Sequence, residues 1–138
     1  MLTIVVPMAG HGSRFSKAGY MDPKPLIPVH GVPMIKLVIA NLRPSRRHHF
    51  LFICQKSHVL AYDLERRLNE WTGGATIVML DQVTEGAACT VLTAREYLPP
   101  DQPLMIANSD QYVDIDINDY LQDIDRRSLD GSLMTMEA

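Results

Sequence analysis

Cysteine is scarce in this chain, long apolar runs are missing, and positive charge is not in excess. The 138 residues include 2 cysteines, Cys54 and Cys89, which lie far apart without a CxxC pair. Neither a zinc site nor a disulfide framework is therefore expected, and both residues are expected to be buried thiols. The formal net charge of −3 gives no reason to expect nucleic acid or an anionic membrane surface as a partner.

The membrane and the secretory route are also disfavoured. No apolar stretch reaches the roughly 20 residues that a membrane-spanning helix needs. The N-terminal residues lack the basic region and the apolar length of a signal peptide, so the cytoplasm is the expected location. With 46% hydrophobic residues the chain has enough apolar side chains for a core, and its length fits a single domain over residues 1–138.

Apolar segments alternate with amphipathic segments along the whole chain. This pattern is typical of parallel strands joined by helical crossovers, and it predicts an α/β fold with a doubly wound, mostly parallel sheet. The expected strands cover residues 2–8, 49–54, 75–80, 103–107 and 131–136. The expected helices cover residues 33–42, 57–71, 86–98 and 118–127.

Local signals support these helices. Pro33 stands at a plausible first helical position, Ser57 is expected to cap the second helix, and Gly73 with Gly74 should end it. One face of this second helix carries Leu60, Leu64, Leu68 and Trp71.

Two segments do not fit the simple pattern. From Gly10 to about Val32 no helix or strand is expected, although connections of this kind usually span roughly 2 to 6 residues. This long loop is net basic in an acidic chain, which indicates either a functional loop or a solvated surface loop. The last expected strand runs into the end of the sequence, so we expect an N-terminal fragment of a longer protein, with a final edge strand as the alternative.

The stretch AGHGSRF follows the first expected strand and can be interpreted in three ways. A dinucleotide fingerprint would need a third glycine where Phe15 stands, and a helix opening there. The string GxxxxGK followed by Ser or Thr, which a P-loop needs, does not occur in the sequence. The third reading is a turn in which Gly10 and Gly12 expose backbone N–H groups to an anion and Arg14 clamps it.

With PKPLIPV downstream, this turn resembles the signature of the sugar-phosphate nucleotidyltransferase family, the NDP-sugar pyrophosphorylases. That signature is a strand, GxGxR, a variable stretch and PKPL. The matching residues are Gly10, Gly12, Ser13, Arg14, Pro23, Lys24, Pro25 and Leu26. The resemblance extends over the whole chain and implies a Rossmann-like, GT-A-type nucleotidyltransferase fold, of which these residues would be roughly the first half or more.

The resemblance implies roles for residues near the turn. In the family the arginine and the lysine neutralise triphosphate charge, which implies catalytic roles for Arg14 and Lys24. The backbone of the glycine loop cradles the phosphates, and here that loop includes Ala9, Gly10, Gly12 and Ser13. From the residues alone, a surface salt bridge for Arg14 and an exposed lysine at position 24 stay open.

The family reads the nucleotide base with the loop after the third strand. Gln82, Gly86 and Ala87 occupy that place here. An amide side chain offers a donor and an acceptor to a base edge, and a glycine lets the backbone approach closely. The family's common proline between the glutamine and the glycine is absent, which leaves the identity of the base open. A tolerated loop glutamine beside a helix cap is the alternative.

The family also places a Mg²⁺-binding aspartate after the fourth strand, which implies this role for Asp110. A magnesium ion bridging phosphate oxygens needs one or two protein carboxylates. The alternative is a turn aspartate. Asp114 and Asp116 form a DxD pair, as in the metal motif of glycosyltransferases, but are expected instead to cap the helix that begins near Asn118.

Geometry and chemistry connect these residues. In a sheet of order 3-2-1-4, strands 1 and 4 flank the point where the winding reverses, and ligands bind beyond their carboxyl ends.

The implied reaction transfers a nucleoside monophosphate from a nucleoside triphosphate to a sugar 1-phosphate and releases pyrophosphate. The implied partners are these two substrates, and a homo-oligomer stays open. A GT-A glycosyltransferase and a non-catalytic nucleotide-binding module are the alternatives, and the second metal carboxylate and the sugar pocket are expected beyond residue 138.

Overall fold

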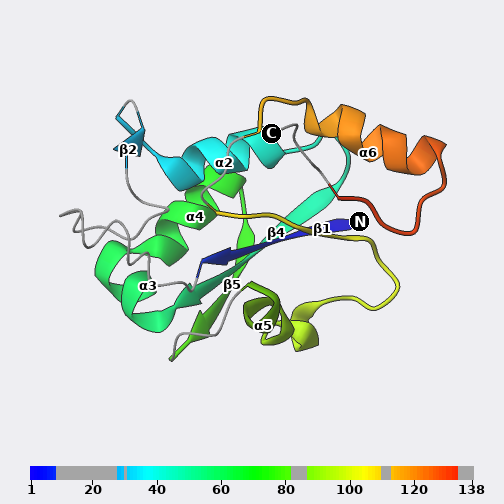
Figure 1. The fold of residues 1–138 in the computed structure, drawn as a ribbon. Helices are drawn as coiled ribbons and strands as arrows, with labels where there is room; N and C mark the ends of the chain where they lie inside the picture. The colour runs from blue at the N-terminus through cyan, green and yellow to red at the C-terminus, as the bar shows by residue number, and fades with distance from the viewer. Residues whose placement is uncertain (9–27, 30, 82–86, 110–112, 134–138) are drawn as a thin grey trace.

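A computed structural model describes residues 1–8, 28–29, 31–81, 87–109 and 113–133 (Figure 1). Strands and helices alternate along the described residues, as the sequence pattern predicts. In chain order the elements are β1 (Leu2–Met8), β2 (Pro28–Val29), β3 (Val32–Pro33), α2 (Met34–Leu42), β4 (His48–Gln55), α3 (Lys56–Tyr62), α4 (Leu64–Thr72), β5 (Ala75–Leu80), α5 (Ala87–Leu92), the 3₁₀ turn η2 (Arg95–Tyr97), β6 (Leu104–Ile106) and α6 (Ile117–Arg126).

Four parallel strands form the main sheet in the order β5-β4-β1-β6. Numbered by their appearance in the chain, these strands follow the predicted order 3-2-1-4. The central strand β1 pairs with β4 along its whole length, from Leu2 opposite His48 to Met8 opposite Cys54. On its other side, β1 pairs with β6. The α/β fold with a doubly wound, mostly parallel sheet is thus confirmed.

Alternate residues of the strands face opposite sides of the sheet, and both sides are covered. Ile4 and Val6 of β1 pack with Phe50 and Phe52 of β4 into a core under four helices, α2, α3, α4 and α6. Val5 points the other way, into a smaller core on the α5 side (Figure 1). Because both faces of β1 and β4 are buried, these two central strands consist mostly of apolar residues. Each fully buried side chain of this size stabilises the fold by about 1.5–3 kcal/mol.

The single helix predicted over 57–71 is two helices, α3 and α4, separated at Asp63. The backbone of Asp63 is left-handed, with φ 53° and ψ 44°, a conformation that aspartate tolerates better than most residues. Ser57 lies inside α3 and is not its cap, because the helix starts one residue earlier, at Lys56. The break also rotates Leu60 away from the core, so that this side chain is 73% exposed while Leu64 is buried.

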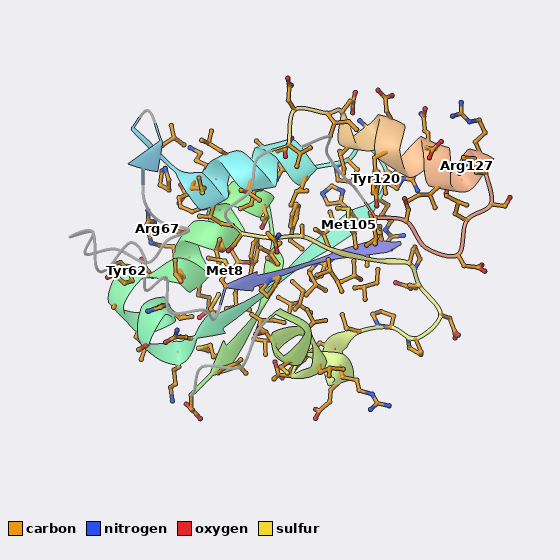
Figure 2. All side chains as sticks on the ribbon, in the orientation of Figure 1. Met8, Tyr62, Arg67, Met105, Tyr120 and Arg127 are labelled. Atoms are coloured by element: carbon orange, nitrogen blue, oxygen red, sulfur yellow. The ribbon has the colours of Figure 1, made fainter. Side chains whose placement is uncertain are left out.

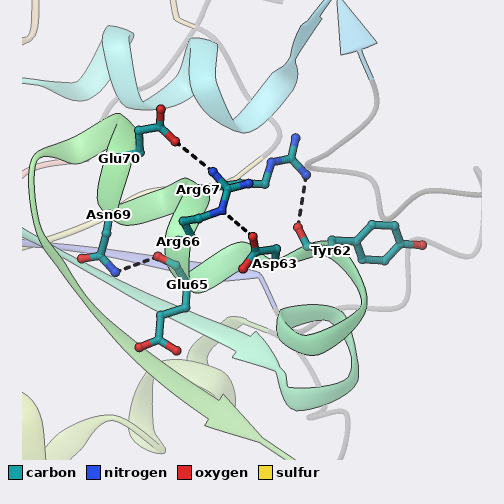
Figure 3. A network of polar contacts seen from close by, with 7 residues as sticks. All are labelled: Tyr62, Asp63, Glu65, Arg66, Arg67, Asn69 and Glu70. Carbon is teal, nitrogen blue, oxygen red and sulfur yellow. Dashed lines mark hydrogen bonds and ion pairs between the residues drawn. The ribbon is translucent and has the colours of Figure 1, made fainter.

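Polar contacts surround this break (Figure 3). Arg66 donates a hydrogen bond from Nε to the Asp63 carboxylate, and this contact raises the pKa of Arg66. Arg67 donates from Nη1 to the backbone carbonyl of Tyr62 at 3.3 Å, which satisfies a carbonyl at the end of α3. Gly73 ends α4 with a left-handed backbone of φ 81°, as predicted.

Four further expectations are corrected. The helix predicted over 86–98 is the short helix α5 followed by the 3₁₀ turn η2. Part of the expected loop before Val32 pairs with β3 as the antiparallel strand β2, and Pro33 is the N-cap of α2 instead of its first residue. Cys89 is exposed, because the first turn of α5 directs Thr90 and Val91 inward instead.

The end of the described chain does not continue the sheet. Gly131, Ser132 and Leu133, the start of the strand predicted over 131–136, lie outside any helix or strand. The remaining part of that prediction falls outside the described residues. Tyr120 of α6 donates a hydrogen bond from its hydroxyl group to the backbone carbonyl of Ser132 at 2.9 Å, which places this segment beside α6.

Candidate functional site

The carboxyl end of β1 is the point where the winding of the sheet reverses. The crossovers lead from β1 outward to β4 and β5, and the chain then returns to add β6 on the opposite side of β1. Met8, at the end of β1, is buried and lies in the centre of Figure 2. Ala107, directly after β6, donates its backbone N–H to the carbonyl of Val5 at 2.9 Å. The chain therefore leaves two adjacent strands at this edge, where ligands of such sheets bind.

Most of the predicted site residues lie beyond the described ends of these strands. Outside the described residues are Ala9, Gly10, Gly12, Ser13, Arg14, Lys24, Gln82, Gly86 and Asp110. The predictions for these residues stay predictions, including the expectation that they meet in one crevice. The described strands show where the neighbours of these residues lie: Met8 precedes the segment with Gly10 and Gly12, Leu80 ends the strand before Gln82, and Ser109 precedes Asp110.

Ala87 is the one predicted site residue that the structure describes. It is the first residue of α5, so the helix begins directly after Gly86, close to the predicted start. α5 is anchored below the sheet by Val91, which packs with Val5 of β1 and Val78 of β5. The helix connects the carboxyl side of β5 with the amino side of β6, so its first turn faces the same edge as the end of β1.

The connection that follows β6 is held in several places. Ser109 is buried, with 8% of its surface exposed. Val113 forms two hydrogen bonds with the side-chain amide of Asn41, at the end of α2. Asp116 caps α6 by accepting a hydrogen bond from the backbone N–H of Asn118 at 2.9 Å, as the sequence predicted. Reasoning from the sequence missed the role of Asn41, because no local signal marks a contact between residues 72 positions apart.

A hollow of about 300 Å³ lies between this connection, the end of α2 and α6. Met105 of β6 and Tyr120 of α6 both line it, and Figure 2 shows them on the same side of the sheet. Its other lining residues are Asn41, Leu42, Ile106, Ala107, Asn108, Val113, Ile117, Ser132 and Leu133. Ile106 of β6, which lines the hollow, is 54% exposed, and β6 is the edge strand of the sheet among the described residues.

The described residues contain no metal cluster, and one of their two cysteines, Cys54, is a buried core residue. Within them, no group of three or more His, Cys, Asp or Glu side chains is arranged to hold a metal ion. Asp116 is used as a helix cap, which favours the capping interpretation of the DxD pair over a metal motif. Burial raises the pKa of the Cys54 thiol to about 12, so this residue is a core thiol and not a nucleophile.

Comparison with known proteins assigns the chain to a family. Residues 4–126 match the MobA-like NTP transferase domain. The chain belongs to this family. Its fold and its motifs agree with that assignment, and the resemblance to sugar-phosphate nucleotidyltransferases inferred from GxGxR and PKPL is confirmed.

Several individual proteins are similar to this NTP transferase domain. It is 24% identical over 119 residues to the bifunctional protein GlmU of Methanocaldococcus jannaschii, a match that covers 86% of this chain and 27% of the relative. It is 28% identical to the crystal structure of a nucleoside-diphosphate-sugar pyrophosphorylase from Vibrio cholerae RC9, with a TM-score of 0.61 over 83% of this chain and 51% of that one.

A third relative shows the shared fold at lower identity. The UDP-glucose pyrophosphorylase of Acinetobacter baumannii is 19% identical, with a TM-score of 0.66 over 93% of this chain and 53% of that one. This NTP transferase domain therefore spans about half the length of these two solved structures. Among its described residues, no helix has both the length and the apolar character to cross a membrane.

Proposed function

We propose that this protein is a sugar-1-phosphate nucleotidyltransferase. A phosphate oxygen of the sugar 1-phosphate attacks the α-phosphorus of a nucleoside triphosphate and forms the new P–O bond. The bond from the α-phosphorus to the oxygen that bridges it to the β-phosphorus breaks, and pyrophosphate leaves with that electron pair. The products are an NDP-sugar and pyrophosphate.

The observation that carries this proposal is which strands of the sheet the motifs follow in the chain. The segment with Gly10, Gly12 and Arg14 follows β1, the strand at which the winding reverses, and Asp110 follows the adjacent strand β6. In open α/β sheets, this edge is where phosphate-bearing ligands bind. Membership of the NTP transferase family supports nucleotide chemistry at this edge, and the named pyrophosphorylase relatives favour a sugar phosphate as the acceptor.

The proposed catalytic residues act through charge and position. The attacking phosphate is already mostly anionic at neutral pH, with a second pKa of about 6, so the protein does not need a nucleophile of its own. Arg14 and Lys24 would oppose the negative charge of the phosphates as it shifts towards the leaving group. The backbone from Ala9 to Ser13 would hold the same phosphates, and Gln82, Gly86 and Ala87 would contact the base.

We further propose that Asp110 binds Mg²⁺, which would neutralise charge on the triphosphate oxygens. A carboxylate is the kind of ligand that this hard cation prefers, and the ion usually keeps several waters. Asp110 would hold the ion on the β6 side of the site, while Arg14 and Lys24 act from the β1 side.

Pyrophosphate release by the intact protein tests the proposal. A set of nucleoside triphosphates is offered with a set of sugar 1-phosphates, and the active pair is used to compare variants. Arg14→Ala and Lys24→Ala should each lower kcat/KM by about 100-fold or more, as loss of one such charge-stabilising contact does in other enzymes. Lys36→Ala and Arg47→Ala remove exposed cations of α2 and of the segment before β4, and should leave kcat/KM unchanged.

The products separate the proposal from its rivals. Pyrophosphate with an NDP-sugar supports it. Free UDP from a UDP-sugar, with no pyrophosphate from a triphosphate, would instead identify a glycosyltransferase. Nucleotide binding without turnover in the intact protein would identify a non-catalytic module. Unaltered nucleotidyl transfer in both the Arg14 and the Lys24 variants would refute the assigned roles.

A further inference from the structure

The side chain of Asn41 binds the backbone of Val113 in the way that a neighbouring strand would. Its Nδ2 donates a hydrogen bond to the Val113 carbonyl at 2.7 Å, and its Oδ1 accepts one from the Val113 N–H at 3.0 Å. The two residues are 72 positions apart and both are half-buried. Among the short side chains, only an amide can donate and accept at the same time in this planar geometry. The contact therefore depends on asparagine in particular.

This contact holds one end of a short span of chain whose other end is also held. At the first end, Ala107 donates its N–H to Val5 of β1 at 2.9 Å, and Ser109 is buried close to it. At the second end stands Val113, bound by Asn41. Asp110 lies midway between the two held ends in sequence and itself falls outside the described residues.

The chain beyond Val113 is fixed to the same part of the fold. The backbone N–H of Ile115 bonds to the Val113 carbonyl at 2.8 Å, turning the chain towards α6. Asn118 in α6 accepts hydrogen bonds from the backbone N–H of Ser45 at 2.8 Å and from its hydroxyl at 3.0 Å. The end of α2 and the α2–β4 connection thus hold the chain at Val113 and at Asn118, and of these two points Val113 is the nearer to Asp110 in the sequence.

We infer that Asn41 is a positioning residue for the β6 side of the site, acting through Val113 on the span that carries Asp110. The inference rests on the proposed function. Without the amide, the Val113 N–H loses the acceptor that Asn41 supplies, and the Val113 carbonyl loses the Asn41 donor but keeps its bond from the Ile115 N–H. Small displacements of a group that acts in the transition state are costly, about 100-fold in rate for about 1 Å. Nucleotide affinity, which many contacts share, should change far less.

A matched control is present in the same chain. Asn69 at the end of α4 makes the same pair of contacts with backbone groups: Nδ2 donates to the Glu65 carbonyl at 2.7 Å, and Oδ1 accepts from the Ala75 N–H at 2.8 Å. The first of these contacts is drawn in Figure 3. Ala75 begins β5, at the amino edge of the sheet, so Asn69 lies away from the proposed site. Removing either asparagine deletes two comparable hydrogen bonds, but only one pair is connected to Asp110.

The experiment compares Asn41→Ala, Asn41→Asp and Asn69→Ala in the intact protein. The aspartate variant is the second probe because it keeps an acceptor for the Val113 N–H and loses the donor to the Val113 carbonyl. We measure kcat and the KM for the nucleoside triphosphate by pyrophosphate release, and hydrogen exchange of the peptides covering 107–113. Both Asn41 variants should lower kcat at least tenfold, with KM changed less than about threefold, and should speed exchange in this segment. Asn69→Ala should leave kcat and this exchange as in the wild type.

The outcomes separate the inference from the proposed function. Equal kcat values for the Asn41 variants and for Asn69→Ala, in an active wild-type background, would overturn the inference alone. So would unchanged exchange over 107–113 in both Asn41 variants. A wild-type protein that releases no pyrophosphate from any substrate pair would refute the proposed function, and the inference with it.

Discussion

Raising the pH above 9 should destabilise this protein through one buried thiol. Cys54 lies in β4 with no exposed surface, and burial raises the pKa of its thiol from the usual value of 9.0 to about 12. The cause is loss of hydration, which disfavours the thiolate. At pH 8 the thiolate fraction of Cys54 is therefore about 10⁻⁴, against about 10⁻¹ for a thiol with a pKa of 9.0.

The sign of the effect on stability follows from the direction of the shift. The folded state holds the thiol proton more tightly than the unfolded state, so no stability is lost below the unfolded pKa of 9.0. As the pH rises from 9 towards 12, the unfolded chain releases this proton first. The unfolded state is thereby stabilised relative to the folded state. The loss of folding free energy from this one group is about 3 kcal/mol at pH 11 and approaches about 4 kcal/mol at higher pH.

Urea unfolding of the wild type and of Cys54→Ala between pH 8 and 11 measures this loss. Tyrosine, lysine and arginine titrate equally in both proteins, so the difference between the two unfolding free energies isolates Cys54. The wild type should lose about 3 kcal/mol more than the variant over this range. A difference that does not change with pH would refute the reasoning.

A thiol reagent provides an independent test. In the native protein at pH 8, an aromatic disulfide should label Cys89, which is exposed, and leave Cys54 unmodified. In denaturant both thiols should react. Rapid native labelling of the Cys89→Ser variant would show that Cys54 is accessible and would contradict the burial from which the pKa shift follows.

Further predictions concern the helices and their packing. Leu68→Ala, at a fully buried position of α4, should lower the free energy of unfolding by about 2–5 kcal/mol in urea titrations, whereas Leu60→Ala, at a side chain that is 73% exposed, should change it by less than about 0.5 kcal/mol. Equal effects would mean that the helix is not broken between them. Asp63→Gly relieves a left-handed backbone that costs about 1–2 kcal/mol and loses an ion pair with Arg66 that is exposed to solvent and therefore contributes little, so the Tm should rise. A lower Tm would show that the ion pair outweighs the strain.

The strands could be predicted because most of their side chains are apolar. Residues 2–8 and 75–80 match β1 and β5, and the other two strands of the main sheet are placed to within a residue or two at each end. A strand covered on both faces is apolar at every position, and glycine or polar residues flank it. An apolar run of this kind is a local pattern, so it can be recognised without knowledge of the fold. The order 3-2-1-4 was predictable from general rules for parallel sheets.

The helices were harder, because their faces depend on what they pack against. Leu60, Leu64 and Leu68 have the spacing of one continuous apolar face, yet Leu60 is exposed and Val59 is buried instead. The core on this side of the sheet contacts Val59 of α3 and Leu64 and Leu68 of α4, and a left-handed Asp63 joins the two helices. The periodicity of apolar residues along the chain does not reveal this break. Cys89 was wrongly expected to be buried for a similar reason: the short helix α5 turns only one side to the sheet.

The sequence by itself determined the α/β class of this protein, its strands and the motifs GxGxR and PKPL that resemble a nucleotidyltransferase. These properties depend on residue types and short spacings, which the chain carries locally. Only the tertiary structure decided that β6 returns beside β1 with its end held by Val5, and that Asn41 binds Val113 across 72 residues. Such contacts form between groups that are distant along the chain, where the packing of other elements brings a donor within reach of an acceptor. They therefore leave no mark in the local sequence.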